Sequence, residues 1–277
     1  MYALFDIGGS KTRVAVSKDL ETLVGEPVLF ETLPQFDDQM RRVAETVHAL
    51  TGGETLTGIA GGLKGSYDRR TGRTGIVPGK DSWADKPFAD QVESLVGVRP
   101  IVLNDTAVVG LGEAHRGAGR GSHILAYFSI STGIGGARIV DGVIDDTRIG
   151  FEPGHQIIDH MSLSRLEGLV GGAALEARSM KRPRDITDPE VWEEEARILS
   201  IGIHNTILHW SPDTVVLGGS MMQGIGVRGI LIESVIKHVQ NLRAIFPIFP
   251  EVPAIKLAEL GAFGGLYGAM VALKKAS

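Results

Sequence analysis

The feature that most constrains the fold is a pattern of strand, glycine-rich turn and second strand that occurs twice. Residues 5–17 read FDIGGSKTRVAVS, and residues 128–142 read FSISTGIGGARIVDG. In each, an apolar run enters a turn with paired glycines and continues with alternating residues, which is typical of a hairpin. Residues 215–221, VVLGGSM, form a further apolar run ending in two glycines. The recurrence predicts two related α/β domains.

Strands and helices alternate around these hairpins. In the first half we expect strands at 2–7, 12–17, 27–32, 55–61 and 100–105, and helices at 35–50 and 86–97. In the second half we expect strands at 122–131, 135–141, 143–148 and 213–217, and helices near 189–210, 227–243 and 261–274. A length of 277 residues also favours two domains. We place a small lobe at 1–117, with the helix at 261–277 packing back on it, and a large lobe at 118–260.

Composition excludes several classes of protein. The net charge is −5 and no run of Lys or Arg forms a basic arm, so a nucleic acid is not an expected partner. There is no cysteine, which excludes disulfides, thiolate metal sites and cysteine nucleophiles. No apolar stretch approaches the roughly 20 residues that span a bilayer, and no signal peptide is visible. We therefore expect a cytoplasmic protein without a membrane partner.

The glycine turns are candidates for phosphate binding. Without side chains at Gly8 and Gly9, backbone N–H groups can approach an anion closely, and Ser10 and Lys11 add a hydroxyl and a charge. The STGIGG run at 131–136 likewise combines glycines with hydroxyl side chains. The alternative is that both are only tight hairpins. Neither a P-loop motif nor a dinucleotide-binding glycine motif occurs.

An acid at a strand end supplies a candidate for chemistry. In VLNDTAVVGLGEA, residues 102–114, Asp105 could accept the proton of an attacking hydroxyl while Asn104 binds a neighbouring hydroxyl. The alternative is that Asp105 caps the helix that follows.

The stretch FEPGHQIIDHMSLSRLEG, residues 151–168, contains a second polar set, Glu152, His155 and Glu167. Its spacing is compatible with a metal site, an acid–base pair or a clamp for a hydroxyl-rich ligand. The least specific interpretation is a charged surface loop.

Taken in order, DIGGSKT, LNDTAVVGLGEA, STGIGGARIVDG, EPGH and VVLGGSM resemble the ROK family of sugar kinases and sugar-responsive repressors. The resemblance covers essentially the whole chain. It implies an actin-like, ribonuclease-H-like α/β fold of two lobes that close on ATP and a hexose or N-acylhexosamine, with Mg²⁺ as cofactor. It also leads us to expect a homodimer.

Carried over by position, the resemblance makes Asp105 the catalytic base and Asp6 the acid that holds Mg²⁺, usually through water. The residues it assigns to sugar binding are Gly65, Asn104, Asp105, Glu152, His155 and Glu167. The residues it assigns to the nucleotide and its phosphates are Gly8, Gly9, Ser10, Lys11, Thr132, Gly133, Gly218 and Gly219.

Departures from the family pattern limit these expectations. Many members bind structural zinc with a cysteine run between the histidine and the second glutamate, whereas this chain has QIIDHMSLSR there, so we expect no zinc site and interpret the stretch as a sugar clamp. KGSYD at 64–68 stands where the family often has Pro-Gly-Pro-Val-Asp. Gly79 stands where a sugar-binding asparagine often precedes a tryptophan, which leaves the identity of the sugar open. We expect Trp83 to be a packing residue.

Three functions fit these observations. A sugar kinase is the favoured one. A repressor would need a helix-turn-helix domain, and the first strand begins at residue 2. A sugar-sensing protein with weak or no kinase activity is the third, and the presence of Asp105 argues against it.

Overall fold

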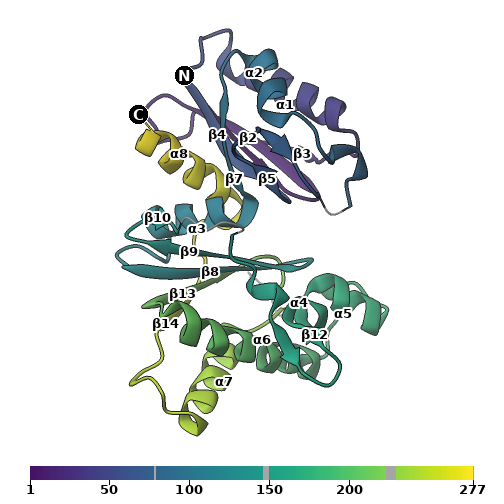
Figure 1. The fold of residues 1–277 in the computed structure, drawn as a ribbon, viewed down its shortest axis with the longest axis vertical. Coiled ribbons are helices and arrows are strands. Elements are labelled where there is room, and N and C mark those ends of the chain that lie inside the picture. Colours follow the sequence, from purple (N-terminus) through teal and green to yellow (C-terminus); the bar gives the residue numbers. More distant parts are fainter. Residues whose placement is uncertain (78, 146–149, 223–228, 277) are drawn as a thin grey trace. The chain divides into compact units, whose positions relative to one another are not determined.

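The computed structural model describes residues 1–277 except 78, 146–149, 223–228 and 277, and it forms two compact units (Figure 1). The first unit combines Met1–His115 with Ala262–Ser277, and the second is Arg116–Gly261.

A five-stranded mixed sheet forms the centre of the first unit. Its strand order is β3 (Val28–Glu31), β2 (Lys11–Ser17), β1 (Tyr2–Ile7), β4 (Gly58–Leu63) and β7 (Pro100–Asn104). β1, β2 and β3 are antiparallel neighbours, whereas β1, β4 and β7 run parallel. The helices of this unit are α1 (Phe36–Thr51), α2 (Phe88–Val96), α3 (Asp105–Arg116) and α8 (Gly264–Ala276).

Alternation along β1 places apolar side chains on both faces of this sheet. Phe5 lies in the core that α1 and α2 cover, whereas Leu4 lies in the core that α3 and α8 cover. Trp83 is 1% exposed and packs edge-on against Phe36, so the prediction that it is a packing residue is confirmed. The parallel part of the sheet is therefore buried on both faces.

The helices α3 and α8 pack with their backbones in close contact. A Cβ atom at Gly268 would lie 1.7 Å from the carbonyl oxygen of Val108, and one at Gly112 would lie 2.4 Å from the carbonyl oxygen of Gly264. Only glycine fits at such an approach. The glycines therefore fix α8 against the helix that begins at Asp105.

The sheet of the second unit repeats this topology. Its order is β10 (Val143–Ile144), β9 (Ile134–Val140), β8 (Ile124–Ile130), β13 (Thr214–Gly218) and β14 (Ala254–Leu257), again with three antiparallel strands followed by two parallel ones. The helices are α4 (Leu166–Val170), α5 (Gly172–Ser179), α6 (Pro189–Trp210) and α7 (Ile232–Ile245). α4, α6 and α7 pack on one face around a core that includes Phe128, Ile203 and Leu217.

Short elements complete both units. Two-stranded sheets pair β5 (Tyr67–Asp68) with β6 (Arg73–Thr74) and β11 (Ile157–Asp159) with β12 (Ser164–Arg165). Single 3₁₀ turns lie at η1 (Asp81–Trp83), η2 (Pro153–His155), η3 (Pro183–Asp185) and η4 (Gly261–Phe263).

The predicted α/β class with duplicated mixed sheets is confirmed, and several element bounds differ. β4 covers 58–63 where 55–61 was expected, and β14 was not expected at all. β10 covers 143–144, and the rest of the strand expected at 143–148 lies largely outside the described residues. The helix expected from 227 begins at 232 as α7, and residues 227 and 228 lie outside the described part.

Candidate active site

Three loops of the first unit leave the same edge of its sheet. β1, β4 and β7 are parallel neighbours whose last residues pair in register. The residues directly after these strands are Gly8, Lys64 and Asp105. The carboxyl ends of adjacent parallel strands are the usual place for ligands in open α/β sheets. The sequence predicts roles for Gly8 and Asp105, but not for Lys64.

The turn between β1 and β2 is held by one hydrogen bond within the turn and by two from Thr32. The N–H of Gly8 donates to the carbonyl of Lys11 at 3.0 Å. From the end of β3, the Thr32 hydroxyl donates to the Gly8 carbonyl at 2.8 Å and the Thr32 N–H donates to the Ser10 carbonyl at 3.0 Å. The N–H of Gly8 is therefore used within the hairpin. The next N–H groups in the turn belong to Gly9 and Ser10.

Asp6, next to the end of β1, is a buried carboxylate that pairs with Arg13 on β2. Nη1 of Arg13 lies 3.2 Å from Oδ2 of Asp6. Burial raises the pKa of Asp6 to about 6, while Arg13 lowers it and the Asp105 charge adds to the rise. Gly265 leaves room for this carboxylate, because a Cβ atom there would lie 2.9 Å from its Cγ.

Asn104 and Asp105 together start α3. The side-chain oxygen of Asn104 accepts hydrogen bonds from the N–H groups of Thr106 and Ala107, at 3.0 and 3.1 Å. Oδ1 of Asp105 also accepts from Thr106, at 2.9 Å. Burial raises the pKa of the Asp105 carboxyl, against the opposing effects of the Lys64 charge and the Thr106 N–H. Capping therefore rests mainly on Asn104, and Asp105 keeps a second carboxylate oxygen for other contacts.

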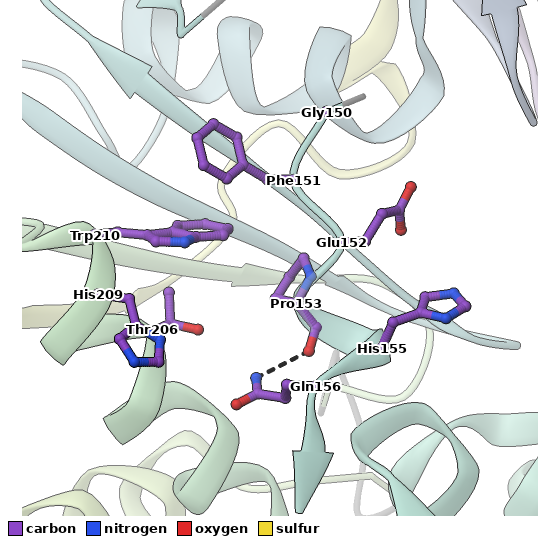
Figure 2. Close-up of a pocket in the computed structure, with 9 residues that line it drawn as sticks. All are labelled: Gly150, Phe151, Glu152, Pro153, His155, Gln156, Thr206, His209 and Trp210. Atoms are coloured by element: carbon purple, nitrogen blue, oxygen red, sulfur yellow. Dashed lines mark hydrogen bonds between the residues drawn. The ribbon is translucent and has the colours of Figure 1, made fainter. Parts of the chain in front are cut away.

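In the second unit, residues 150–156 are anchored by the side chains of Phe151, Pro153 and Gln156. The Phe151 ring lies 4.7 Å from the Trp210 ring, centroid to centroid. Pro153 packs on Gly136, where a Cβ atom would lie 2.3 Å from its Cγ. Nε2 of Gln156 donates to the Pro153 carbonyl at 2.9 Å, which closes the 3₁₀ turn (Figure 2). These contacts fix the backbone that carries Glu152 and His155.

The side chains of Glu152 and His155 lie on the side of this segment that faces away from the Phe151 and Trp210 rings. Figure 2 shows their side chains directed away from Phe151 and Trp210. Both residues are exposed. An open pocket of about 370 Å³ adjoins the segment and is lined by Gly150, Phe151, Glu152, Pro153, His155, Gln156, Thr206, His209 and Trp210.

Glu167, the second residue of α4, lies beside His155. Its Oε1 is 3.5 Å from Nε2 of His155, and its Oε2 accepts from the Ile134 N–H at 3.4 Å. A Cβ atom at Gly133 would lie 2.9 Å from the same Oε2. On the opposite side of the imidazole, Nη1 of Arg165 lies 2.8 Å from Nδ1 of His155. Glu167, His155 and the turn at Gly133 therefore form one cluster within the second unit.

The turn between β8 and β9 is tied to the start of α5. The carbonyls of Ser131 and Thr132 accept hydrogen bonds from the N–H groups of Gly172 and Ala173, at 2.7 and 3.0 Å. A Cβ atom at Gly172 would lie 2.9 Å from the Ser131 carbonyl oxygen, so this approach requires glycine. The contact fixes the backbone at Thr132.

The paired glycines after β13 have a packing role. Gly219 adopts φ +96°, and a Cβ there would lie 2.2 Å from the Ile130 carbonyl oxygen. A Cβ at Gly218 would lie 2.6 Å from Oη of Tyr127. Close packing against β8 therefore accounts for both glycines, whatever further role they have.

The predicted site residues thus fall into two sets, one in each unit. Lys64 and Arg165 contact these sets without having been predicted. The strand expected at 55–61 ends before Lys64, so nothing in the sequence marked this lysine; for Arg165 the available signal was its position two residues before Glu167. Among the described residues, no three His, Asp or Glu side chains gather in a way that could hold a metal ion. Within the same residues, no helix is long and apolar enough to cross a bilayer.

The duplicated mixed sheets define the actin-like ATPase class, and comparison with solved structures agrees. A ROK hexokinase from Thermus thermophilus superposes with a TM-score of 0.79 at 25% identity, over 99% of both chains. A ROK family glucokinase from Streptomyces griseus, solved with glucose and AMPPNP, shares the fold with a TM-score of 0.77 at 21% identity, over 99% of both chains.

Sequence comparison gives the family. The ROK family profile matches residues 2–276, so the chain belongs to the ROK family. A glucokinase from Thermotoga maritima is 33% identical over 159 residues, which are 56% of this chain and 50% of that protein. The aligned part thus spans half the length of that relative.

Proposed function

We propose that the protein is a sugar kinase that transfers the terminal phosphoryl group of ATP to a hydroxyl of a hexose or N-acylhexosamine. The observation that carries the proposal is the meeting of Asp105 with the glycine turn after β1 at one sheet edge, in a chain of the ROK family. We further propose that the two units are the small and large lobes expected from the sequence.

Asp105 is the general base of this proposal. As the sugar oxygen forms a bond to the terminal phosphorus, the bond from that phosphorus to the bridging oxygen breaks, ADP leaves, and the hydroxyl proton passes to the Asp105 carboxylate. Burial makes this carboxylate more basic than an exposed one, because its pKa is raised. The N–H of Thr106 orients it from one side.

The glycine turns bind the nucleotide in this proposal. In the first unit the groups are the N–H groups of Gly9 and Ser10, the Ser10 hydroxyl and the Lys11 ammonium, with Gly8 allowing close approach. Lys11 lies on the same face of β2 as Arg13, which contacts Asp6, because side chains two apart on a strand share a face. In the second unit we assign Thr132 and Gly133 to the phosphates and Gly218 and Gly219 to the adenosine.

The sugar is held by two groups of residues. In the second unit they are Glu152, His155 and Glu167, the clamp, which offer carboxylate acceptors and one imidazole. In the first unit they are Asn104 and Gly65. Since the Asn104 oxygen is used in capping α3, its amide NH₂ is the group that would donate to a sugar hydroxyl.

A magnesium ion fits the first unit. Mg²⁺ in nucleotide sites takes one or two carboxylates together with water and phosphate oxygens. Asp6 and Asp105 supply two carboxylates close enough for the charge of one to raise the pKa of the other. When bound, the ion would neutralise phosphate charge, and Asp6 would hold it through water.

The test is consumption of ATP across a panel of hexoses and hexosamines. We expect one or more sugars to stimulate it, and Asp105→Asn to lower the turnover about 100-fold or more while the sugar still binds. Asp90→Asn is the matched control, since Asp90 is an exposed acid of the same unit that pairs with Arg99. An unchanged rate for Asp105→Asn would rule out Asp105 as the general base. Sugar binding without turnover by the unmodified protein would instead favour the sugar-sensing alternative.

A further inference from the structure

Lys64 occupies the middle position at the sheet edge that carries the candidate chemistry of the first unit. It comes directly after β4, which lies between β1 and β7 in the sheet. Its N–H donates to the Ile7 carbonyl at 2.9 Å, so the pairing with β1 continues one residue past β4. The backbone of Lys64 is therefore fixed between the turn that starts at Gly8 and the helix that starts at Asp105.

The Lys64 side chain lies over the glycine turn. A Cβ atom at Gly9 would be 2.9 Å from Cδ, 3.1 Å from Cε and 3.9 Å from Nζ of Lys64. A side chain at position 9 would require the end of this lysine to move from its present position. Gly9 thus does more than allow an anion to approach, because it also leaves the space in which the lysine stem lies.

The charges nearby give the Lys64 ammonium a defined role. Asp6 already has a cationic partner in Arg13. For Asp105, the positive charge with the largest effect on its carboxylate is that of Lys64. A nucleotide on the turn would add several negative charges at this edge, and phosphoryl transfer depends on neutralising them.

We propose that Lys64 binds the terminal phosphate of the nucleotide through Nζ and holds it between Gly9 and Asp105. The inference rests on the proposed function and adds a residue that the family resemblance does not supply, since KGSYD replaces Pro-Gly-Pro-Val-Asp there. A lysine suits the task as a flexible point charge with three donors. The competing explanation is that Lys64 is only a counter-ion for Asp105.

The two explanations predict different effects of Lys64 on nucleotide affinity. A lysine on the terminal phosphate should matter for AMPPNP and not for ADP, whereas a counter-ion for Asp105 should not distinguish the two. We would measure the affinity of AMPPNP and of ADP, each with Mg²⁺, by titration calorimetry on the unmodified protein and on Lys64→Met. We expect Lys64→Met to weaken AMPPNP about tenfold or more, as for loss of a hydrogen bond to a charged group, and to change ADP about twofold at most. Lys64→Arg, which keeps the charge, should recover part of the loss.

Lys18→Met is the matched control. Lys18 comes after β2 at the opposite end of the sheet, where it pairs with Glu54, and its removal should leave both affinities unchanged. Thermal unfolding of each variant checks that it is folded, and Lys64→Gln replaces Lys64→Met if the latter is not. Unchanged AMPPNP affinity in Lys64→Met, or an equal loss for AMPPNP and ADP, would overturn the assignment to the terminal phosphate. If the unmodified protein binds neither nucleotide, the proposed function itself fails.

Discussion

At the scale of single residues, the contact between Arg165 and His155 fixes the state of the imidazole. A guanidinium has donors and no acceptor, so Nδ1 of His155 must accept the hydrogen bond from Arg165. The proton of the neutral ring then lies on Nε2, the atom 3.5 Å from Oε1 of Glu167. His155 would therefore present a donor on the side of Glu167, and Glu167 would supply the acceptors. A donor beside acceptors suits a ring of hydroxyl groups.

The clamp gives a prediction on substrate affinity. Glu167→Ala should raise the sugar KM about tenfold or more and change the ATP KM little, since leaving a hydroxyl and its partners unsatisfied costs roughly 1–3 kcal/mol. Glu152→Ala should behave in the same way. Steady-state kinetics with one substrate varied at a time measures both constants. Glu176→Ala, in α5, is the control and should alter neither constant. If Glu167→Ala raised the ATP KM more than the sugar KM, this residue would instead be assigned to the nucleotide site.

The sequence predicts the two local motifs at this scale and misses their non-local partners. Asn104 and Asp105 are adjacent, and an Asn-Asp step before a helix is visible in the sequence itself. Lys64 reaches Asp105 only because β4 pairs with β7, and Arg165 reaches His155 only because β11 and β12 form a hairpin. Such proximity depends on strand register, which a single sequence does not state.

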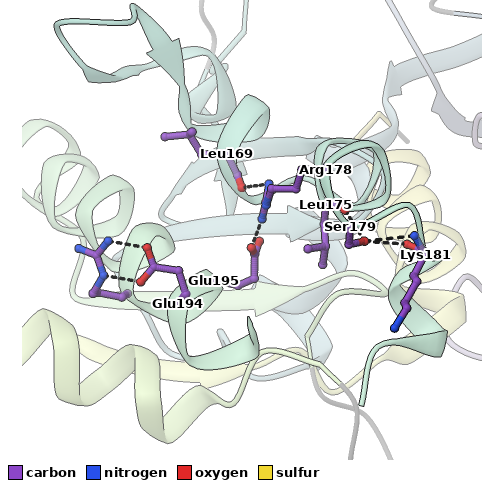
Figure 3. Close-up of polar contacts among 8 residues, drawn as sticks. Leu169, Leu175, Arg178, Ser179, Lys181, Glu194 and Glu195 are labelled. Carbon is purple, nitrogen blue, oxygen red and sulfur yellow. Dashed lines mark hydrogen bonds and ion pairs between the residues drawn. The ribbon is translucent and has the colours of Figure 1, made fainter. Parts of the chain in front are cut away.

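At the scale of elements, Arg178 and the buried acid Glu195 together link three helices of the second unit (Figure 3). Arg178 of α5 donates from Nη1 to the Leu169 carbonyl of α4 at 2.7 Å, and its Nη2 pairs with Oε1 of Glu195 on α6. The Glu195 side chain is 1% exposed, and its Oε2 has no hydrogen-bond partner among the described residues. The contact holds α4, which carries Glu167. Burial raises the pKa of Glu195 to about 7, although Arg178 opposes the rise.

This raised pKa predicts a pH dependence of stability. Between the ordinary value of 4.5 and about 7, the folded state keeps a proton that the unfolded state has lost. The stabilisation from that proton is therefore complete below pH 4.5 and is lost as the pH rises through about 7. Glu195→Gln carries no such proton, so its melting temperature relative to that of the unmodified protein should rise between about pH 5.5 and about 7.5.

Glu194→Gln is the control for this experiment. Glu194 is the exposed neighbour that pairs with Arg197, and this contact lowers the pKa of its carboxyl. Because Glu194 is ionised in both states above about pH 5.5, its replacement should give a nearly constant difference in melting temperature. The same constant difference for Glu195→Gln would contradict the raised pKa. Melting curves at four or five pH values measure both.

Strand existence was easier to predict than strand ends. β1 and the long helix α6 were predicted at their observed bounds: the first begins with the mainly apolar run YALF, and the second is a helix of 22 residues. β14 was missed because it is a four-residue edge strand with alternate residues exposed. Packing against β13, rather than any local preference, makes it a strand.

At the scale of the whole molecule, the duplicated sheet explains why the fold class could be predicted. The recurrence marks the same hairpin in both units, β1 with β2 and β8 with β9, although Gly8 and Gly9 lie in the turn whereas Gly135 and Gly136 lie within β9. The two units differ after their third strand, where the first continues into α1 and the second inserts the hairpin of β11 and β12. The length and contacts of that hairpin correspond to no motif in the sequence.

The metal content is the prediction for the protein as a whole. The stretch at 151–168 has no cysteine, Nδ1 of His155 accepts from Arg165, and among the described residues no three His, Asp or Glu side chains gather as a metal site would require. Purified protein should contain less than one zinc per chain by elemental analysis. It should also keep its melting temperature after chelation, since we expect no structural metal in this fold. Stoichiometric zinc, or unfolding by a chelator, would overturn the sugar-clamp interpretation of this stretch.

The first unit is interrupted in the sequence by the second, and this has a consequence during translation. A ribosome releases β1, β4 and β7 before the whole of the second unit, and α8 only after it. Until α8 emerges, the face of the nascent sheet that bears Leu4 and Ala60 lacks Leu266 and Met270, which cover it in the finished protein. Domains generally fold as units, so the inserted unit can form on the ribosome while the first one waits. The strands that carry the proposed catalytic edge are thus the first to be made and among the last to be enclosed.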